Sequence, residues 1–156
     1  MTAQDIHDLF KKYGRTLGAA ESFTGGLFSS EITSIAGASA FFKGSLVTYA
    51  TEEKQRILGV SPYVINLKGV VSQECAGEMA SHARSLLNTD YAISFTGNAG
   101  PDAMEDKPVG EIYIAVAMLD TVRVYSYRLN GDRKNIQNQA LVLGYQLLAQ
   151  NLEEFK

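Results

Sequence analysis

The sequence is poor in the residues that build cross-links and metal clusters. Cys75 is its only cysteine, which excludes a disulfide within the chain and a metal cluster held by cysteines. The two histidines, His7 and His82, lie far apart and lack the spacing of metal ligands. Cys75 falls at an apolar position of an expected helix, where a small buried side chain is the simplest interpretation. We therefore expect neither a bound metal nor a cofactor.

The sequence also lacks long apolar runs and a strong excess of either charge. No apolar run approaches the length of about 18 residues that indicates a membrane-spanning helix, and residues 1–5 lack the basic start of a signal peptide. The net charge of −3 gives no electrostatic footprint for nucleic acid or an anionic membrane. These absences predict a cytoplasmic protein that binds neither nucleic acid nor a membrane.

What is present is typical of one globular domain. The chain has 156 residues, of which 46% are hydrophobic and 20% are charged, as in ordinary folded proteins. A chain of this length buries roughly 68–70% of its unfolded surface and needs no covalent cross-link to be stable. We therefore expect a single domain over residues 1–156.

Helical and strand patterns alternate along the chain. Thr2, Ser61, Ser72 and Asp132 each stand where a helix is expected to begin, and serine, threonine and aspartate are favoured capping residues. Buried or β-rich runs cover residues 17–20, 45–49, 91–95, 111–118 and 122–129, the last two forming a hairpin. This order predicts an α/β fold, a three-layer α/β/α sandwich around a mixed five-stranded sheet.

The first candidate site follows the strand at residues 17–20. Ser22, Thr24, Gly25 and Gly26 lie between that strand and a helix, and glycines there allow backbone N–H groups to approach an anion. The motif lacks the GK[ST] element of a phosphate-binding P-loop. A plain strand-to-helix turn explains it equally well.

The second candidate site combines Ser39, Tyr49 and Lys54. A serine hydroxyl becomes a nucleophile when a base takes its proton, and a lysine can be that base once its pKa is lowered. A tyrosine can relay a proton near the same centre. Taken alone, the spacing is weak, because a turn serine, a strand-end tyrosine and a solvated lysine would look the same.

The third candidate site is the loop after the strand at residues 91–95. Thr96, Gly97 and Gly100 permit a tight loop with exposed backbone donors, which suits a phosphate or an oxyanion. Arg133 opens the last expected helix and could bind a phosphate or carboxylate through two hydrogen bonds. Because ligands of open α/β sheets bind beyond the carboxyl ends of the strands, the three loops are expected to share one pocket.

Seven sequence blocks resemble, in their order, the CinA C-terminal domain family, which includes stand-alone deamidases of nicotinamide mononucleotide. They are AESFTGG at residues 20–26, GAS at 37–39, VTY at 47–49 with Lys54, GVVS at 69–72, TGNAGP at 96–101, KPVG at 107–110 and GDR at 131–133. The resemblance covers the chain from about Leu17 to the last helix. Seven ordered blocks are far more specific than any one of them.

This resemblance implies an amidohydrolase that converts nicotinamide mononucleotide and water to nicotinate mononucleotide and ammonia, without a metal. It implies Ser39 as the nucleophile, with Lys54 and Tyr49 as its catalytic partners. Ser22 is the alternative nucleophile. The resemblance also implies that a group of further residues binds the substrate, and that the protein forms a homo-oligomer. Ser22, Thr96 and Arg133 match further active-site positions of the family, and the loop pattern itself adds Thr24, Gly25, Gly26, Gly97 and Gly100 to the expected substrate-binding residues.

Two departures from the family pattern keep other functions open. Phe23 replaces the usual cysteine after the Glu-Ser pair, and Asn98 replaces an apolar residue in the third loop. Such changes beside the pocket are compatible with a regulatory module that binds a nucleotide without turnover. A serine amidase with another small substrate is a further alternative.

Overall fold

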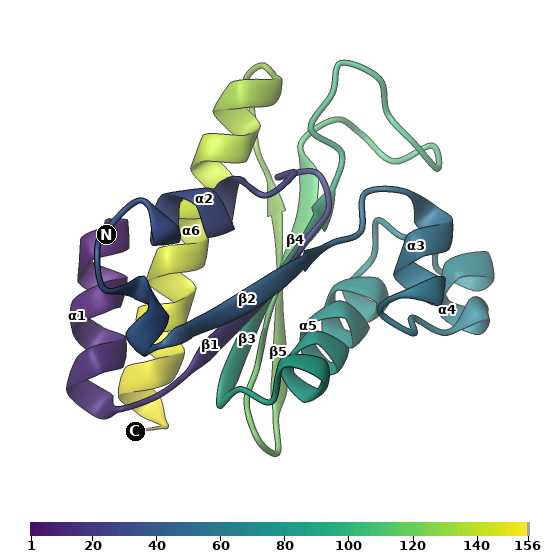
Figure 1. The fold of residues 1–156 in the computed structure, drawn as a ribbon. Helices are drawn as coiled ribbons and strands as arrows, with labels where there is room; N and C mark the ends of the chain where they lie inside the picture. The colour runs from purple at the N-terminus through teal and green to yellow at the C-terminus, as the bar shows by residue number, and fades with distance from the viewer. Residues whose placement is uncertain (156) are drawn as a thin grey trace.

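The computed structural model describes residues 1–155 as an open sheet of five strands with helices on both faces (Figure 1). The strands are β1 (Leu17–Glu21), β2 (Phe42–Val47), β3 (Tyr91–Gly97), β4 (Glu111–Ala117) and β5 (Val122–Arg128). The helices are α1 (Ala3–Tyr13), α2 (Leu27–Thr33), α3 (Thr51–Arg56), α4 (Pro62–Leu67), α5 (Gln73–Leu87) and α6 (Arg133–Glu154). The predicted three-layer α/β/α sandwich with a mixed five-stranded sheet is confirmed.

The strand order β2-β1-β3-β4-β5 explains where a ligand site can form. β1 pairs in parallel with both β2 and β3, whereas β4 and β5 run antiparallel and make the predicted hairpin. The carboxyl ends of the three parallel strands therefore lie at one edge of the sheet. The loops that follow them meet at this edge, as in other open α/β sheets.

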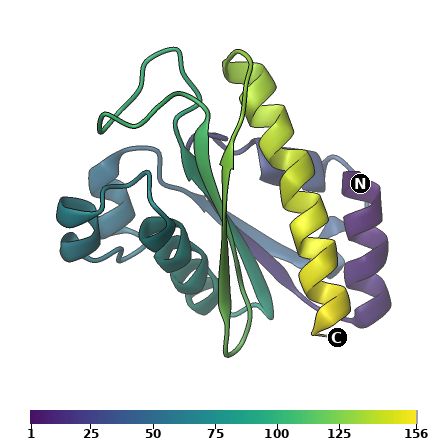
Figure 2. The same ribbon diagram turned by 180° about the vertical axis from the view of Figure 1, so that it is seen from behind.

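Two helical layers bury the two faces of the sheet, and β3 shows how. Successive side chains of a strand point to opposite faces. Ile93 and Phe95 pack in the larger apolar cluster with α1, α2 and α6, while Ala92 packs in the cluster on the α5 face. The Ser94 hydroxyl donates to the carbonyl of Ala76 in α5 at 2.6 Å. Figure 2 shows the two layers from behind.

The predicted helix starts are confirmed by their capping hydrogen bonds. The Thr2 hydroxyl accepts from the Asp5 N–H in a capping box, and the side chains of Ser72 and Asp132 accept from a backbone N–H at the starts of α5 and α6. Ser61 caps α4, with proline at its first position. Within residues 1–155, no helix is both long and apolar enough to cross a membrane.

The second strand differs from its prediction. It runs over Phe42–Val47 rather than 45–49, because Gly44 adopts a φ of +147° and the register with β1 shifts there. That irregularity breaks the alternation by which a strand is recognised. Ser39 lies just before the strand in a short 3₁₀ turn, Ala38–Ala40, where a loop was expected.

Candidate active site

The candidate site lies at the carboxyl ends of the parallel strands. Ser22 directly follows β1, Tyr49 follows β2 by two residues, and Gly97 ends β3. Arg133 reaches the same edge from the first turn of α6. Side chains that are far apart in the sequence are thereby brought together by the sheet.

Lys54 and Ser22 form the central contact. Lys54 Nζ lies 2.9 Å from Ser22 Oγ, 2.7 Å from the carbonyl oxygen of Thr48 and 3.2 Å from that of Tyr49. Lys54 is only 1% exposed, although it belongs to a helix of a single turn and a half on the surface. A fully buried lysine without a carboxylate partner is rare, because burial penalises its charge.

The surroundings favour a neutral amine on Lys54. Burial lowers its pKa below the usual value, and the nearby carboxylates of Glu105 and Glu52 oppose this shift. The neighbouring thiol of Cys75 remains protonated, because burial raises its pKa to about 12. A neutral amine has two N–H donors for the carbonyls of Thr48 and Tyr49. Its lone pair then faces the Ser22 hydroxyl, which is the arrangement of a base beside its nucleophile.

The expectation that Ser39 shares a pocket with Tyr49 and Lys54 is wrong. Ser39 precedes β2, whereas Tyr49 and Lys54 follow it, so the length of the strand, roughly 20 Å, separates them. Ser39 is exposed in a separate hollow lined by residues 33–44. The serine that contacts Lys54 is Ser22, the alternative that the sequence left open.

Glu21 fixes the loop that carries Ser22. This glutamate is fully buried at the end of β1, and its two carboxylate oxygens accept four hydrogen bonds. The donors are the N–H groups of Gly26 and Phe28 and both the N–H and the hydroxyl of Ser29, at 2.6–3.2 Å. A carboxylate at the start of α2 also suits the positive end of the helix.

The two glycine N–H groups of the first loop are consequently not available to an anion, although its sequence predicts them to be. The Gly26 N–H is used by Glu21, and the Gly25 N–H donates to the carbonyl of Ser22 at 3.0 Å. Thr24 is 3% exposed and its hydroxyl has no partner among residues 1–155. Thr24, Gly25 and Gly26 thus shape the turn below Ser22, and none of the three lines the cavity described next.

A cavity of about 450 Å³ opens above Ser22, a volume within the usual range for small-molecule sites. It is lined by Ser22, Phe23, Tyr49, Gly97, Asn98, Ala99, Gly100, Pro101, Asp102, Met104 and Arg133. Arg133 links its two sides: one Nη donates to the carbonyl of Gly100 at 2.7 Å and the other to the Tyr49 hydroxyl at 2.8 Å. Arg133 is therefore the positively charged side chain on the wall of this cavity.

The third loop contributes its backbone to the cavity, but Thr96 does not. The Thr96 hydroxyl donates to the carbonyl of Val70 at 2.7 Å, and its residue is 1% exposed. Gly97 and Gly100 lie on the cavity wall. Gly97 tolerates no side chain, because a Cβ there would lie 2.8 Å from the carbonyl oxygen of Glu111.

The two departures from the family pattern are both structural. Asn98 is 2% exposed and holds the loop that follows it: its amide donates to the carbonyls of Met104 and Lys107 and accepts from the Met104 N–H. Phe23 is 3% exposed, and it belongs to the main apolar cluster. Neither side chain forms a hydrogen bond with Lys54 or Ser22.

Sequence reasoning missed the side chains that brace the third loop from outside. Glu105 accepts from the N–H groups of Val70 and Val71 at 2.9 and 2.8 Å, and the Lys107 ammonium donates to the carbonyls of Lys68 and Val71. Exposed acidic and basic residues in a loop carry no local signal for such contacts. Among residues 1–155, no three His, Cys, Asp or Glu side chains are grouped so that they could hold a metal ion.

Comparison with known proteins gives a single family. Residues 1–152 match the sequence model of the CinA C-terminal domain. A competence-damage inducible protein of Listeria innocua is 49% identical over 143 residues, which are 90% of this chain and 34% of that protein. The chain thus spans about a third of the length of the curated relatives it matches.

Solved structures agree with this match. The competence damage-inducible protein A from Klebsiella pneumoniae has a TM-score of 0.96 at 26% identity, covering 99% of this chain and 96% of that one. The competence/damage inducible protein CihA from Agrobacterium tumefaciens has a TM-score of 0.91 at 31% identity, covering 97% and 93%. On sequence and fold together, this chain belongs to the CinA C-terminal domain family.

Proposed function

We propose that this domain is an amidohydrolase that converts nicotinamide mononucleotide to nicotinate mononucleotide and ammonia, with Ser22 as its nucleophile. The observation that carries the proposal is the buried Lys54 Nζ, 2.9 Å from Ser22 Oγ. A serine next to an amine of lowered pKa is equipped for acyl transfer. The amide and the nucleotide are taken from the resemblance of the site motifs to the family's deamidases.

Lys54 serves as base and then as acid in the proposed reaction. It takes the proton of Ser22 as Oγ attacks the amide carbon, and it returns that proton to the leaving nitrogen, so that ammonia departs and a Ser22 ester remains. Water then attacks the ester while Lys54 again accepts a proton. Return of this proton to Oγ frees the carboxylic acid and restores the enzyme.

Backbone donors next to Ser22 support a site for the developing oxyanion. The N–H group of Phe23, which lines the cavity, and that of Thr24 just beneath it have no hydrogen-bond partner within residues 1–155, although both residues are at most 3% exposed. Unpaired donors beside a nucleophile are what oxyanion stabilisation requires. Gly25 and Gly26 allow the tight turn that leaves these two groups outside any helix.

The substrate phosphate needs a cation, and Arg133 supplies one. Its guanidinium lies on the cavity wall with the Tyr49 hydroxyl, so both can turn toward an anionic ligand. Tyr49 is 62% exposed and can follow Arg133 as the ligand enters. A nucleotide substrate is consistent with a cytoplasmic enzyme, and we extend the proposal to a homo-oligomer on the family resemblance.

The test is ammonia release from nicotinamide mononucleotide by the purified protein, with Ser22→Ala, Lys54→Met and the matched control Ser39→Ala. We expect Ser22→Ala and Lys54→Met each to lower kcat by about a thousandfold or more, since both remove the acyl-transfer step. Ser39→Ala is expected to stay within about twofold of the native rate. Mass spectrometry of the native protein quenched during turnover should detect an acyl group on the peptide that contains Ser22.

Three results would contradict this proposal in whole or in part. Loss of activity in Ser39→Ala with full activity in Ser22→Ala would identify Ser39, at the other end of β2, as the nucleophile. Tight binding of the nucleotide without any ammonia release by the native protein would favour the alternative, a regulatory module that retains the pocket. Release of ammonia only from other amides in a substrate panel would keep the chemistry and change the substrate.

A further inference from the structure

The loop that carries Ser22 has three successive carbonyl groups, and each of them accepts a hydrogen bond. The carbonyls of Ser22 and Thr24 accept from the backbone N–H three residues later, at 3.0 and 2.9 Å. The carbonyl between them, that of Phe23, accepts from Gln137 Nε2 at 2.8 Å. Of the three carbonyls, that of Phe23 is therefore held by a side chain from a distant element, the helix α6.

The Phe23 carbonyl matters because it shares a peptide unit with the Thr24 N–H. This peptide is trans, so it is planar and its C=O and N–H point in opposite directions. The hydrogen bond from Gln137 thus fixes the plane of the peptide and directs the Thr24 N–H away from the Gln137 side chain. That N–H is one of the two unpaired donors beside Ser22.

This peptide is also the part of the turn that can rotate. Residues 22–25 form a turn that is closed by a hydrogen bond between its first carbonyl and its last N–H, and the peptide between Phe23 and Thr24 is central in it. Turns of types I and II differ by rotation of this central peptide. Complete inversion would give the β-branched Thr24 a positive φ, which is costly. Gln137 therefore acts against smaller rotations, which would turn the N–H away from its target.

Gln137 shares its face of α6 with Arg133. The two residues are four apart, and residues at this spacing lie on the same face of a helix. Arg133 contacts the carbonyl of Gly100 and the Tyr49 hydroxyl. This face of α6 thus contacts the segments that follow all three parallel strands, and Gln137 makes the contact with the segment after β1.

We propose that Gln137 is a positioning residue of the Ser22 site, which holds the Phe23–Thr24 peptide so that the Thr24 N–H can meet the developing oxyanion. The inference rests on the proposed function, because it requires acyl transfer at Ser22. Gln137 does not line the cavity, so its replacement removes no contact from the substrate. An oxyanion donor acts in the transition state, and loss of its alignment should therefore lower kcat and leave KM unchanged.

The first test replaces Gln137 and follows ammonia release from nicotinamide mononucleotide. Gln137→Met keeps the length of the side chain and removes its donor, whereas Gln137→Lys retains a donor. We expect Gln137→Met to lower kcat about tenfold with KM within about twofold, and Gln137→Lys to recover most of the loss. The effect is smaller than the hundredfold or more that removal of an oxyanion donor causes, because the Thr24 N–H is still present. The pH at which kcat/KM rises should not move, since Lys54 keeps its contacts.

The second test does not depend on the nucleotide. With p-nitrophenyl acetate, Ser22 Oγ bonds to the acetyl carbon as p-nitrophenolate leaves, and the serine proton passes to Lys54. This step passes through the same kind of oxyanion as the amide reaction. Release of p-nitrophenolate gives its rate, and mass spectrometry locates the acetyl group on the peptide that contains Ser22. Gln137→Met should acquire this group about tenfold more slowly than the native protein.

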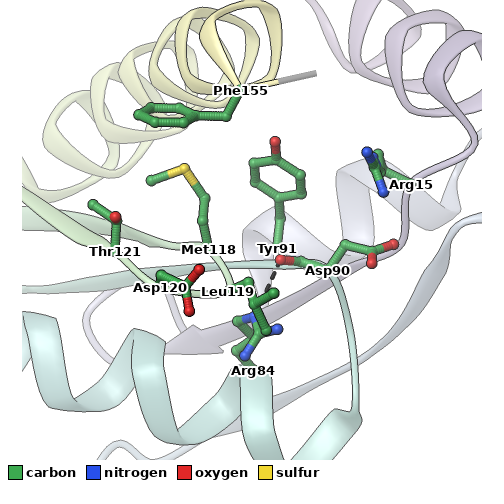
Figure 3. A pocket seen from close by; sticks show the side chains of 9 residues that line it. All are labelled: Arg15, Arg84, Asp90, Tyr91, Met118, Leu119, Asp120, Thr121 and Phe155. Atoms are coloured by element: carbon green, nitrogen blue, oxygen red, sulfur yellow. Dashed lines mark hydrogen bonds between the residues drawn. The ribbon is translucent and has the colours of Figure 1, made fainter.

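Gln139→Met is the matched control. Gln139 also belongs to α6, and its Nε2 donates to the carbonyl of Asn130 at the same distance of 2.8 Å. Phe155→Leu tests the other end of the helix, because Phe155 lines a cavity of about 400 Å³ where β3 begins (Figure 3). The seven residues of β3 place that cavity roughly 20 Å from Ser22. Both controls should acylate Ser22 at the native rate, whereas general loosening of α6 would slow all three variants.

The outcomes separate this inference from the proposed function. If Gln137→Met acylates Ser22 at the native rate, no faster than Gln139→Met, the inference falls and the proposed function stands. A higher KM with unchanged kcat, or a loss that Gln137→Lys does not recover, also overturns the inference alone. Slower acylation in Gln137→Met without ammonia release by the native protein would support the inference and change only the substrate. A native protein whose Ser22 is never acylated would overturn both.

Discussion

Two glycine-containing loops follow the neighbouring parallel strands β1 and β3, and they are stabilised in different ways. The loop after β1 is held from within, by the carboxylate of Glu21 at the end of the strand itself. The loop after β3, residues 98–110, is held from within by the Asn98 amide and also needs support from outside: Glu105 and Lys107 contact residues 68–71, which lie more than 30 residues earlier in the chain.

The difference teaches how a site can be both fixed and accessible. The Glu21 side chain is fully buried, so the loop that carries Ser22 cannot open without exposing this carboxylate. Glu105 and Lys107 make their contacts near the surface, and side-chain hydrogen bonds of this kind are lost at a lower free energy than a core contact. The proposed nucleophile thus stands on the rigid loop, and the cavity wall opposite belongs to the more easily opened one.

Replacement of Glu21 should destabilise the loop after β1. Glu21→Ala leaves three N–H groups at the start of α2 without their acceptor, and each buried unpaired group costs about 1–3 kcal/mol. We expect the free energy of unfolding to fall by about 3–5 kcal/mol, together with loss of turnover. Urea unfolding followed by circular dichroism measures the first quantity, and ammonia release measures the second.

Glu31→Ala is the matched control for this prediction. Glu31 is an exposed glutamate on the same helix, α2, so its replacement changes charge by the same amount. It should alter stability by no more than about 0.5 kcal/mol. Equal effects of the two substitutions would mean that the Glu21 contacts do not stabilise the loop.

A methyl group at Gly69 should displace Glu105, which supports the loop after β3 from outside. Gly69 has a φ of +83°, and a Cβ there would lie 1.7 Å from Glu105 Oε2. Gly69→Ala therefore combines backbone strain with loss of the two hydrogen bonds from Val70 and Val71, and should cost about 2–3 kcal/mol. Limited proteolysis should cut the variant within residues 98–110 faster than the native chain.

Gly14→Ala is the matched control, because it introduces the backbone strain of a positive φ without displacing a neighbouring side chain. Gly14 also has a positive φ, +61°, but nothing lies within 4 Å of a Cβ built there. Its replacement should cost only about 1 kcal/mol and leave proteolysis of residues 98–110 unchanged. If both variants lose the same stability and are cut alike, Glu105 does not support the loop.

Most of the fold follows from local patterns in the sequence. Caps at Thr2, Ser72 and Asp132 are local hydrogen bonds within three residues, and the β4–β5 hairpin joins neighbouring strands, so short windows contain their causes. The second strand was misplaced because Gly44 interrupts its alternation. Strand order and register came from the structure, since they depend on packing between distant segments.

The candidate site was predicted in part for the same reason. The sequence placed polar residues at strand ends, and parallel pairing brought Ser22, Lys54 and Arg133 to one edge. The family resemblance put Ser39 first and left Ser22 as the alternative, and only the path of β2 shows that Ser39 lies at the opposite end of that strand from Lys54. The sequence also could not show that Glu21 uses the N–H groups of the first loop, which requires a buried side chain to turn back over its own strand end.

Lys54 allows a finer comparison of the two loops. It contacts Ser22 in the loop after β1, and its pKa is affected by the charge of Glu105 in the loop after β3. Burial lowers its pKa, and the carboxylate of Glu105 acts in the opposite direction. The neutral amine is the active form in the proposed reaction, so kcat/KM should rise with pH through the lowered pKa, below 10.5. Glu105→Gln removes the opposing charge and should move this rise to lower pH, while Glu53→Gln, which removes a charge from α3 on the side of Arg56, should not.

The same variant tests whether the effect is electrostatic. A charge effect weakens as ionic strength increases, so the difference between Glu105→Gln and the native profile should shrink in high salt. If loop opening caused the shift instead, water would reach Lys54, relieve its desolvation and move the rise to higher pH. The direction in which Glu105→Gln shifts the pH profile therefore decides whether the loop after β3 acts on the pKa of Lys54 through the charge of Glu105 or through the position of the loop.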